Sequence, residues 1–190
     1  MISAPAAVTG RPGALIDGKL VRTKIDTPLG SMVAVADDAA LHLLEFENRV
    51  ALTGELRRLE RDSGSINFGS NNILELTVAQ LNDYFAGKSA AFRISTIQRG
   101  TMLEEAVWRA LKQIPPGQTR SYGDIARVIG QPEKSREVGK ANGANNVSII
   151  VPCHRVIGSD GSLVGYGGGL WRKRWLLDHE RRYAWESYEH

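Results

Sequence analysis

Hydrophobic and polar positions in residues 20–98 follow two periods, which together predict a small sheet and two amphipathic helices. Alternating and short apolar runs are typical of strands, and they cover 20–25, 31–36 and 41–46. Asp37-Asp38 suits a turn between the last two runs. Apolar residues three or four positions apart then predict helices over 50–62 and 73–85, the second stopping near Gly87.

The second half of the chain predicts several short helices with recognisable first residues. Thr101 followed by Glu104 forms a capping box, and the helix it begins ends at the proline-glycine sequence 114–117. Ser121 caps a helix over 122–129, and Ser135 begins one that runs through Asn142. Two short helices joined by a turn that contains glycine are typical of a helix-turn-helix unit.

A short apolar run and a last helix complete the second half. Ser148–Val151 predicts a strand that Pro152 stops, and residues 171–179 predict a helix after a glycine-rich loop. The expected fold class is therefore α/β plus α, with a strand–helix domain over 20–98 and a helical domain over 99–182. Residues 1–19 lack periodicity and predict a disordered leader, and 183–190 predict a tail.

Charge is distributed unevenly between the two halves. Residues 99–182 carry 14 Lys and Arg against 8 Asp and Glu, whereas residues 1–98 carry 10 against 11. A basic second half favours a polyanion such as DNA as partner, although such a surplus is also compatible with ordinary solubility. No apolar stretch is long enough for a membrane span or a secretory signal, so we expect a cytoplasmic protein.

Cys153 is the only cysteine in the sequence. One thiol cannot form an internal disulfide, and it is a single ligand where a structural metal needs several, so we expect no metal site. A free cysteine is either a small buried hydrophobe or a nucleophile. Pro152 before it and the His154-Arg155 pair after it favour a reactive site.

Residues 152–156, Pro-Cys-His-Arg-Val, resemble the active-site signature of the O6-alkylguanine-DNA alkyltransferases, a family of DNA repair proteins. Further blocks in the same order extend the resemblance from about Arg99 to Glu180: Val107-Trp108, Ile114-Pro115-Pro116-Gly117, Arg120-Ser121-Tyr122-Gly123, Val138-Gly139, Ala141-Asn142-Gly143 and Gly165-Tyr166-Gly167-Gly168-Gly169. The resemblance implies an RNase H-like first domain and a helix-turn-helix, winged-helix-like second domain that carries the cysteine.

The same resemblance implies the reaction. Such proteins flip O6-alkylguanine out of duplex DNA and transfer the alkyl group irreversibly to the cysteine, here Cys153, once per molecule and without a cofactor. They are methylated-DNA–protein-cysteine S-methyltransferases that bind the minor groove as monomers. Repair of O4-alkylthymine and cooperative binding along DNA stay open.

The resemblance also assigns roles to residues around the cysteine. His154 is the expected base, acting through a water, and Glu180 orients its ring. Asn145 is expected to support the turn beneath Cys153. The family has proline at the next position, whereas this chain has Asn146, so we expect a less rigid loop.

DNA contacts and the base pocket are implied in the same way. Arg136 is expected to fill the space left by the flipped base, and Tyr122 to contact the target nucleotide. Small residues are expected to let the helix that carries Arg136 approach the groove; they are Ala141, Asn142 and Gly143. The expected pocket residues are Pro152, Val156, Tyr166 and Gly167. Some relatives have serine where this chain has Gly167, which predicts a more open lip that accepts bulkier alkyl groups.

Two other functions compete with this interpretation. Cys, His and Glu are also the residues of a cysteine hydrolase, although no oxyanion loop is evident and the histidine is adjacent to the cysteine. A protein that binds lesions without transferring the alkyl group is the second alternative, which an unreactive Cys153 would favour.

Overall fold

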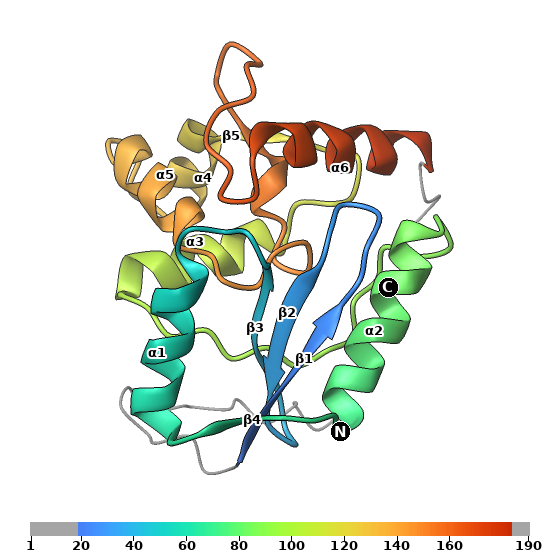
Figure 1. Cartoon of the computed structure of the whole chain (residues 1–190). Coiled ribbons are helices and arrows are strands. Elements are labelled where there is room, and N and C mark those ends of the chain that lie inside the picture. The colour runs from blue at the N-terminus through green and yellow to red at the C-terminus, as the bar shows by residue number, and fades with distance from the viewer. Residues whose placement is uncertain (1–18, 184–190) are drawn as a thin grey trace, which may run out of the picture.

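A four-stranded sheet forms the centre of the first half in the computed structural model, which describes residues 19–183 (Figure 1). Its strands are β1 (Leu20–Ile25), β2 (Met32–Ala36), β3 (Leu41–Phe46) and β4 (Ile66–Phe68), in the order β3-β2-β1-β4. β2 is antiparallel to both neighbours, and β4 is parallel to β1. The three strands expected from the sequence are confirmed. β4 was not predicted, because only Ile66 of its three residues is buried and no alternation can be seen.

Two helices cover opposite faces of this sheet (Figure 1). Alternate strand residues pack on each side: Val35 and Leu43 lie with α1 (Leu52–Ser63), whereas Ala34 and Leu44 lie in the core shared with α2 (Asn72–Phe85). The predicted helices are confirmed. This arrangement follows from strand geometry, since successive side chains point to opposite faces.

The second half is mainly helical, as expected. Its elements are α3 (Met102–Leu111), β5 (Arg120–Ser121), α4 (Tyr122–Val128), α5 (Ser135–Gly143), η1 (Cys153–Arg155), β6 (Val156–Ile157) and α6 (Leu170–Arg182). Thr101 and Ser121 both form complete capping boxes, with Glu104 and Asp124 respectively, which confirms the predicted helix starts. α6 is longer than predicted, and the short parallel pair β5–β6 was not predicted.

The predicted strand over 148–151 is wrong: this segment is a turn, and Cys153 lies in a short 3-10 helix. The Val151 amide donates to the Val147 carbonyl at 3.0 Å and the Ile150 amide to Ser148 at 2.9 Å, so the hydrogen bonds close locally. Ile149 has a φ of 72°, a left-handed conformation that is rare for a β-branched residue. Its complete burial holds it there and turns the chain toward the cysteine.

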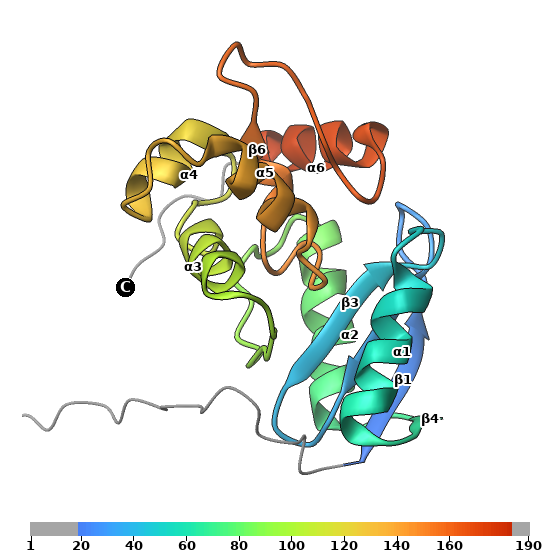
Figure 2. The same ribbon diagram turned by 90° about the vertical axis from the view of Figure 1, so that its left-hand side faces the viewer.

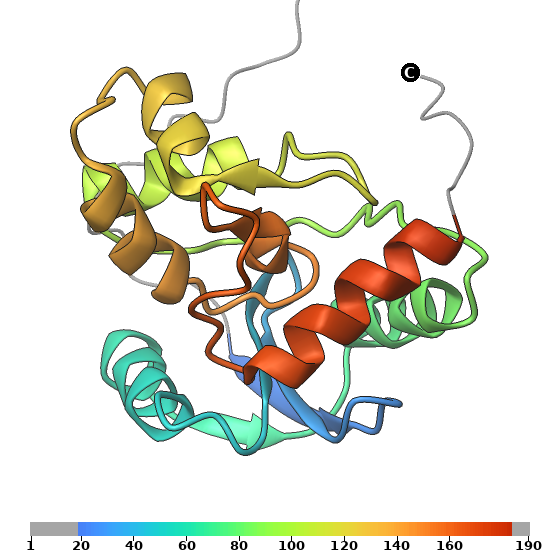
Figure 3. The ribbon, with the colours of Figure 1, turned by 90° about the horizontal axis from the view of Figure 1, so that it is seen from above.

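The two halves share one core at the β3 edge of the sheet. The Leu44 amide donates to the Asn146 carbonyl at 2.9 Å, and the Ser148 amide donates to the Leu44 carbonyl at 2.8 Å. Figures 2 and 3 show the segment between α5 and η1 lying against the sheet, with α6 passing across the same end. The loop that precedes the cysteine is therefore fixed by the first half of the chain.

The expected leader and tail fall almost wholly outside the described residues. Between residues 19 and 183, no helix has the length and apolar character needed to cross a membrane.

Candidate active site

Cys153 lies in η1, 5% exposed, and side-chain amides from the preceding segment hold its backbone. The Asn145 Nδ2 group donates to the Val151 carbonyl at 2.9 Å, and Asn142 Nδ2 donates to the Cys153 carbonyl at 3.3 Å. Asn145 Oδ1 in turn accepts from the Val147 amide at 3.1 Å. These bonds close the turn that presents the thiol.

The thiol is protonated at rest. Burial raises the pKa of Cys153 to about 11, and nearby Glu45 acts in the same direction, while the Asn145 amide and the cations Arg49 and Lys173 oppose the shift. Because only the thiolate attacks efficiently, this cysteine needs a base before it can react.

His154 and Glu180 form a buried pair behind the cysteine. The two side chains are 0% exposed, and His154 Nε2 lies 2.8 Å from Glu180 Oε1. Burial lowers the pKa of His154 despite the opposing Glu180 charge, so the ring is neutral at neutral pH. The pair joins η1 to α6 across 26 positions of sequence.

Glu180 also accepts hydrogen bonds from three other groups. Arg155 donates through Nε at 2.9 Å and Nη2 at 2.8 Å, the Tyr84 hydroxyl donates at 2.9 Å, and the Gly117 amide donates at 3.1 Å. Burial alone would raise the pKa of Glu180, but His154 and Arg155 lower it far below its usual value. The carboxylate is therefore ionised and can only accept.

An ionised Glu180 decides the tautomer of the imidazole. His154 Nε2 must donate the proton to the carboxylate, which leaves Nδ1 as the acceptor and hence as the basic atom. Nδ1 is buried and has no hydrogen-bond partner in residues 19–183. The ring is thus oriented and neutral, with one basic nitrogen uncommitted.

A small cavity lies beside the thiol, with a volume of about 10 Å³, which is room for about one water molecule. Cys153, Tyr166 and Gly167 are among its lining residues. The Tyr166 hydroxyl is buried without a partner in the described part of the chain, and burial keeps its pKa well above the usual value, so it is a donor. Pro152 and Val156, which were expected in the pocket, are both buried but do not line this cavity; Pro152 lines a different one.

Lys173 joins the start of the glycine-rich loop to β6, a contact that sequence reasoning missed. Its ammonium donates to the carbonyls of Val156 and Val164, both at 2.6 Å. Burial lowers the pKa of Lys173 to about 8, although Cys153 opposes the shift. The signal was a lysine on the apolar side of α6, one helical turn before Leu177.

The expected DNA-contact residues lie on α4 and α5. Arg136 is exposed near the start of α5, and the structure records no ion pair with Glu133 or Glu137. Tyr122 is half-buried, and its hydroxyl donates to the Val164 carbonyl at 3.2 Å. The small residues lie together in the last turn of α5: Ala141 and Asn142 are buried, and Gly143 is exposed.

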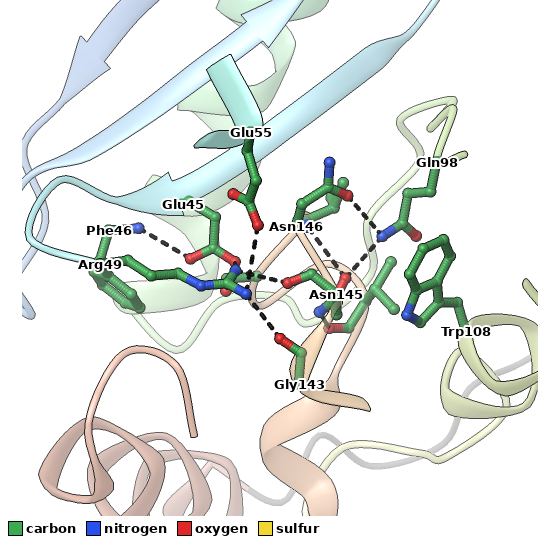
Figure 4. A network of polar contacts seen from close by, with 12 residues as sticks. Glu45, Phe46, Arg49, Glu55, Gln98, Trp108, Gly143, Asn145 and Asn146 are labelled. Carbon is green, nitrogen blue, oxygen red and sulfur yellow. Dashed lines mark hydrogen bonds and ion pairs between the residues drawn. The ribbon is translucent and has the colours of Figure 1, made fainter. Parts of the chain in front are cut away.

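Asn146 does not leave its loop loose. Its Nδ2 donates to the His42 carbonyl at 3.2 Å, and its Oδ1 accepts from Gln98 at 3.1 Å. Gln98 also donates to Asn145 Oδ1 at 2.8 Å (Figure 4). The expectation of a less rigid loop stays a prediction, and these hydrogen bonds, one to β3 and one from Gln98, oppose it by restraining the side chain at the position where the family has proline.

Glu45 and Arg49 form a buried network that sequence reasoning also missed (Figure 4). They pair with each other, and Arg49 reaches the carbonyls of Gly143 at 2.8 Å and Asn145 at 2.7 Å. Ser148 donates to Glu45 at 2.8 Å. The signal was a charged residue within the apolar run of β3, since a buried charge requires a partner.

The buried thiol, followed in the chain by a neutral histidine whose ring a carboxylate orients, suits a cysteine-dependent enzyme, and the helix-turn-helix half that carries them suits one that binds nucleic acid. Comparisons with known proteins identify the family. The model described as 6-O-methylguanine DNA methyltransferase, ribonuclease-like domain, matches residues 20–97, and its DNA binding domain counterpart matches residues 102–182. The chain belongs to this family of DNA repair methyltransferases.

Individual relatives agree with this assignment. A methylated-DNA–protein-cysteine methyltransferase of Salmonella typhimurium is 43% identical over 165 residues, covering 85% of this chain and 96% of the relative. One from Mycobacterium bovis is 56% identical over 107 residues, covering 56% of this chain and 65% of the relative. The solved structure of Mycobacterium tuberculosis OGT in complex with DNA has a TM-score of 0.76 and 40% identity, covering 86% of this chain and 94% of that one.

Proposed function

We propose that this protein repairs O6-alkylguanine in double-stranded DNA by transferring the alkyl group irreversibly to Cys153, once per molecule. The observation that supports this most directly is the buried pair of His154, which directly follows the buried thiol in the chain, and the ionised Glu180; the pair leaves His154 Nδ1 without a hydrogen-bond partner in residues 19–183. Together with the thiol, the pair supplies a nucleophile, a base and the group that orients the base, within a family of DNA methyltransferases.

The proposed transfer begins with removal of the Cys153 proton. His154 Nδ1 takes the proton through a bridging water, and Glu180 stabilises the resulting imidazolium. The thiolate then attacks the alkyl carbon, so that an S–C bond forms as the C–O6 bond breaks. The buried Tyr166 hydroxyl donates a hydrogen bond to the negative charge that develops on the departing guanine, and the proton that His154 took from the sulfur balances the one that the guanine takes up.

The product explains the proposed stoichiometry. A thioether is not hydrolysed by water, and nothing in the proposed site returns the sulfur to a thiol. No cofactor takes part, because the alkyl group passes directly from oxygen to sulfur. The cavity beside Cys153 must widen to admit a purine, so base entry requires movement of its walls.

The DNA contacts are proposed from the placement of α4 and α5. Arg136 is exposed and forms no ion pair with any of residues 19–183, so it is available to enter the base stack and fill the position of the flipped nucleotide. The small residues Ala141 and Gly143 allow the same helix to lie close to the backbone of a minor groove. Tyr122 lies between α4 and the glycine-rich loop, where the target nucleotide would pass.

Intact mass spectrometry tests the proposal. Protein incubated with a duplex that contains O6-methylguanine should gain one methyl, about 14 Da, on the nucleophilic Cys153 and no more with excess DNA. Cys153→Ser is the matched control and should remain unmodified while still binding the duplex.

The alternatives predict different results. A protein that binds the lesion and stays unmodified is a lesion-binding protein, and one that turns over a substrate repeatedly is a hydrolase. Either result would reject the proposed transfer.

A further inference from the structure

Arg49 is a residue of the first half that hydrogen-bonds to the end of α5 and to the segment that leads into the cysteine turn. Its guanidinium donates to the carbonyls of Gly143 and Asn145, which lie at and just after the C-terminus of α5. Carbonyls at that position lack partners within the helix, and a cation is favoured there by the helix dipole. Arg49 thus fixes the short segment that runs from α5 to the cysteine turn (Figure 4).

The guanidinium is itself held in place from two sides. Glu45 on β3 pairs with it, and Glu55 on α1 lies 3.5 Å from Nη2. Glu45 also accepts from Ser148 and from the Phe46 amide, so that both of its carboxylate oxygens are hydrogen-bonded. A buried arginine with this many partners has little freedom to move away.

Arg49 also occupies the space beside Gly167. A Cβ added at position 167 would lie 2.8 Å from Arg49 Nε and 3.2 Å from Cζ. The sequence predicted that glycine here leaves an open lip. The structure reverses this expectation, because the missing side chain makes room for Arg49 instead.

The same side chain faces the thiol's cavity. Arg49, Glu45, Cys153 and Gly167 line one cavity of about 10 Å³. An alkyl group that approaches the sulfur from this side meets a guanidinium held by two carbonyls and a carboxylate, and a larger group needs more displacement of that side chain.

We propose that Arg49, held by Glu45, is a specificity-determining residue of the alkyl-transfer site and limits the size of the alkyl group that reaches Cys153. The inference rests on the proposed function, since it concerns the substrate range of that site. The first domain thereby acts on substrate choice through one side chain.

The test compares two substrates in the same duplex, O6-benzylguanine and O6-methylguanine at one position, so that DNA affinity cancels in the ratio of their rates. In Arg49→Ala the ratio of the benzyl to the methyl transfer rate should rise about tenfold. Removing the Arg49 side chain enlarges the site, and a difference of one methylene in a pocket already changes selectivity about tenfold or more. Arg49→Lys keeps the charge and most of the volume and should retain most of the wild-type ratio.

Two further variants control for folding and charge. Glu45→Gln combined with Arg49→Ala avoids a buried unpaired carboxylate, and it decides the matter if Arg49→Ala alone does not fold. Lys24→Ala removes a cation paired with Glu47 on the surface of the same sheet and should leave the ratio unchanged.

The outcomes separate this inference from the proposed function. A wild-type protein that accepts neither alkyl group rejects the function itself. A reactive wild type whose ratio stays within about twofold in the Ala variants, or is equal in Arg49→Lys and Arg49→Ala, rejects the role of Arg49 in selectivity.

Discussion

Glu180→Gln tests whether the carboxylate sets the tautomer of His154. A glutamine can place its amide nitrogen at either former oxygen position. At Oε2 it would face two donors, Arg155 Nε and the Gly117 amide. At Oε1 it would face only one group that cannot accept, Arg155 Nη2, together with the Tyr84 hydroxyl, which can accept, and His154, which can exchange its proton to Nδ1. The second orientation is the better one, and it makes the basic nitrogen unavailable.

The magnitudes follow from these contacts. Loss of a positioned base lowers the transfer rate by about 10²–10⁴-fold. Arg155 also loses its charged partner, and removing one member of a buried ion pair costs about 3–5 kcal/mol of unfolding free energy. Glu180→Gln should therefore be both slower and less stable than the wild type.

Single-turnover kinetics separates the two effects. On the proposed single turnover, the amplitude with O6-methylguanine duplex measures the active fraction, and the rate constant measures the chemistry. Tyr84→Phe is the matched control: it removes one donor from the same carboxylate at a cost of about 1.5–3 kcal/mol and leaves the tautomer unchanged. Equal rate constants in Glu180→Gln and the wild type would refute the tautomer argument, as would a Tyr84→Phe rate that falls as far.

Three further predictions concern the thiol, the lip and the loop. Burial raises the pKa of Cys153 to about 11, so iodoacetamide should label the folded protein at pH 8 at least about tenfold more slowly than the urea-unfolded chain. The labelling rate of the folded protein should also rise from pH 7 to pH 9. A rate that reaches a plateau below pH 8 would contradict the raised pKa. Gly167→Ser should lower the unfolding free energy by about 1–3 kcal/mol, because the added side chain clashes with Arg49. In a double-mutant cycle measured by urea denaturation, Gly167→Ser should cost less when Arg49 is already alanine. Additive costs would argue against the clash. Asn146→Ala loses two buried hydrogen bonds and should be destabilised by about 1–3 kcal/mol, measured by urea denaturation against an exposed control such as Lys88→Ala; an unchanged midpoint would mean that these bonds do not restrain the loop.

Local patterns predicted the elements whose causes are local. Capping boxes at Thr101 and Ser121 begin helices because their bonds join residues three apart, and the alternation in β1 to β3 reflects a sheet with two covered faces. β4 was not predicted, because three residues are too few to show an alternation of apolar and polar positions. Ser148–Val151 misled because an apolar run is compatible with a buried turn as well as with a strand.

Only those residues of the candidate site that belong to a sequence motif were predicted. Cys153 and its neighbours are recognisable as a sequence, and Glu180 and Asn145 came from the family resemblance. Arg49 and Tyr84 were not found, because their partners lie about a hundred positions away: Arg49 reaches Asn145 across 96 residues, and Tyr84 reaches Glu180 across 96.

The sequence by itself therefore determined the helices, the main strands, the candidate nucleophile and the family. Only the tertiary structure decided which imidazole nitrogen is basic, what fills the space beside Gly167 and how the first domain contacts the cysteine turn. Periodicity and capping depend on neighbours along the chain, whereas the charge state of a buried group depends on every residue that packing brings against it.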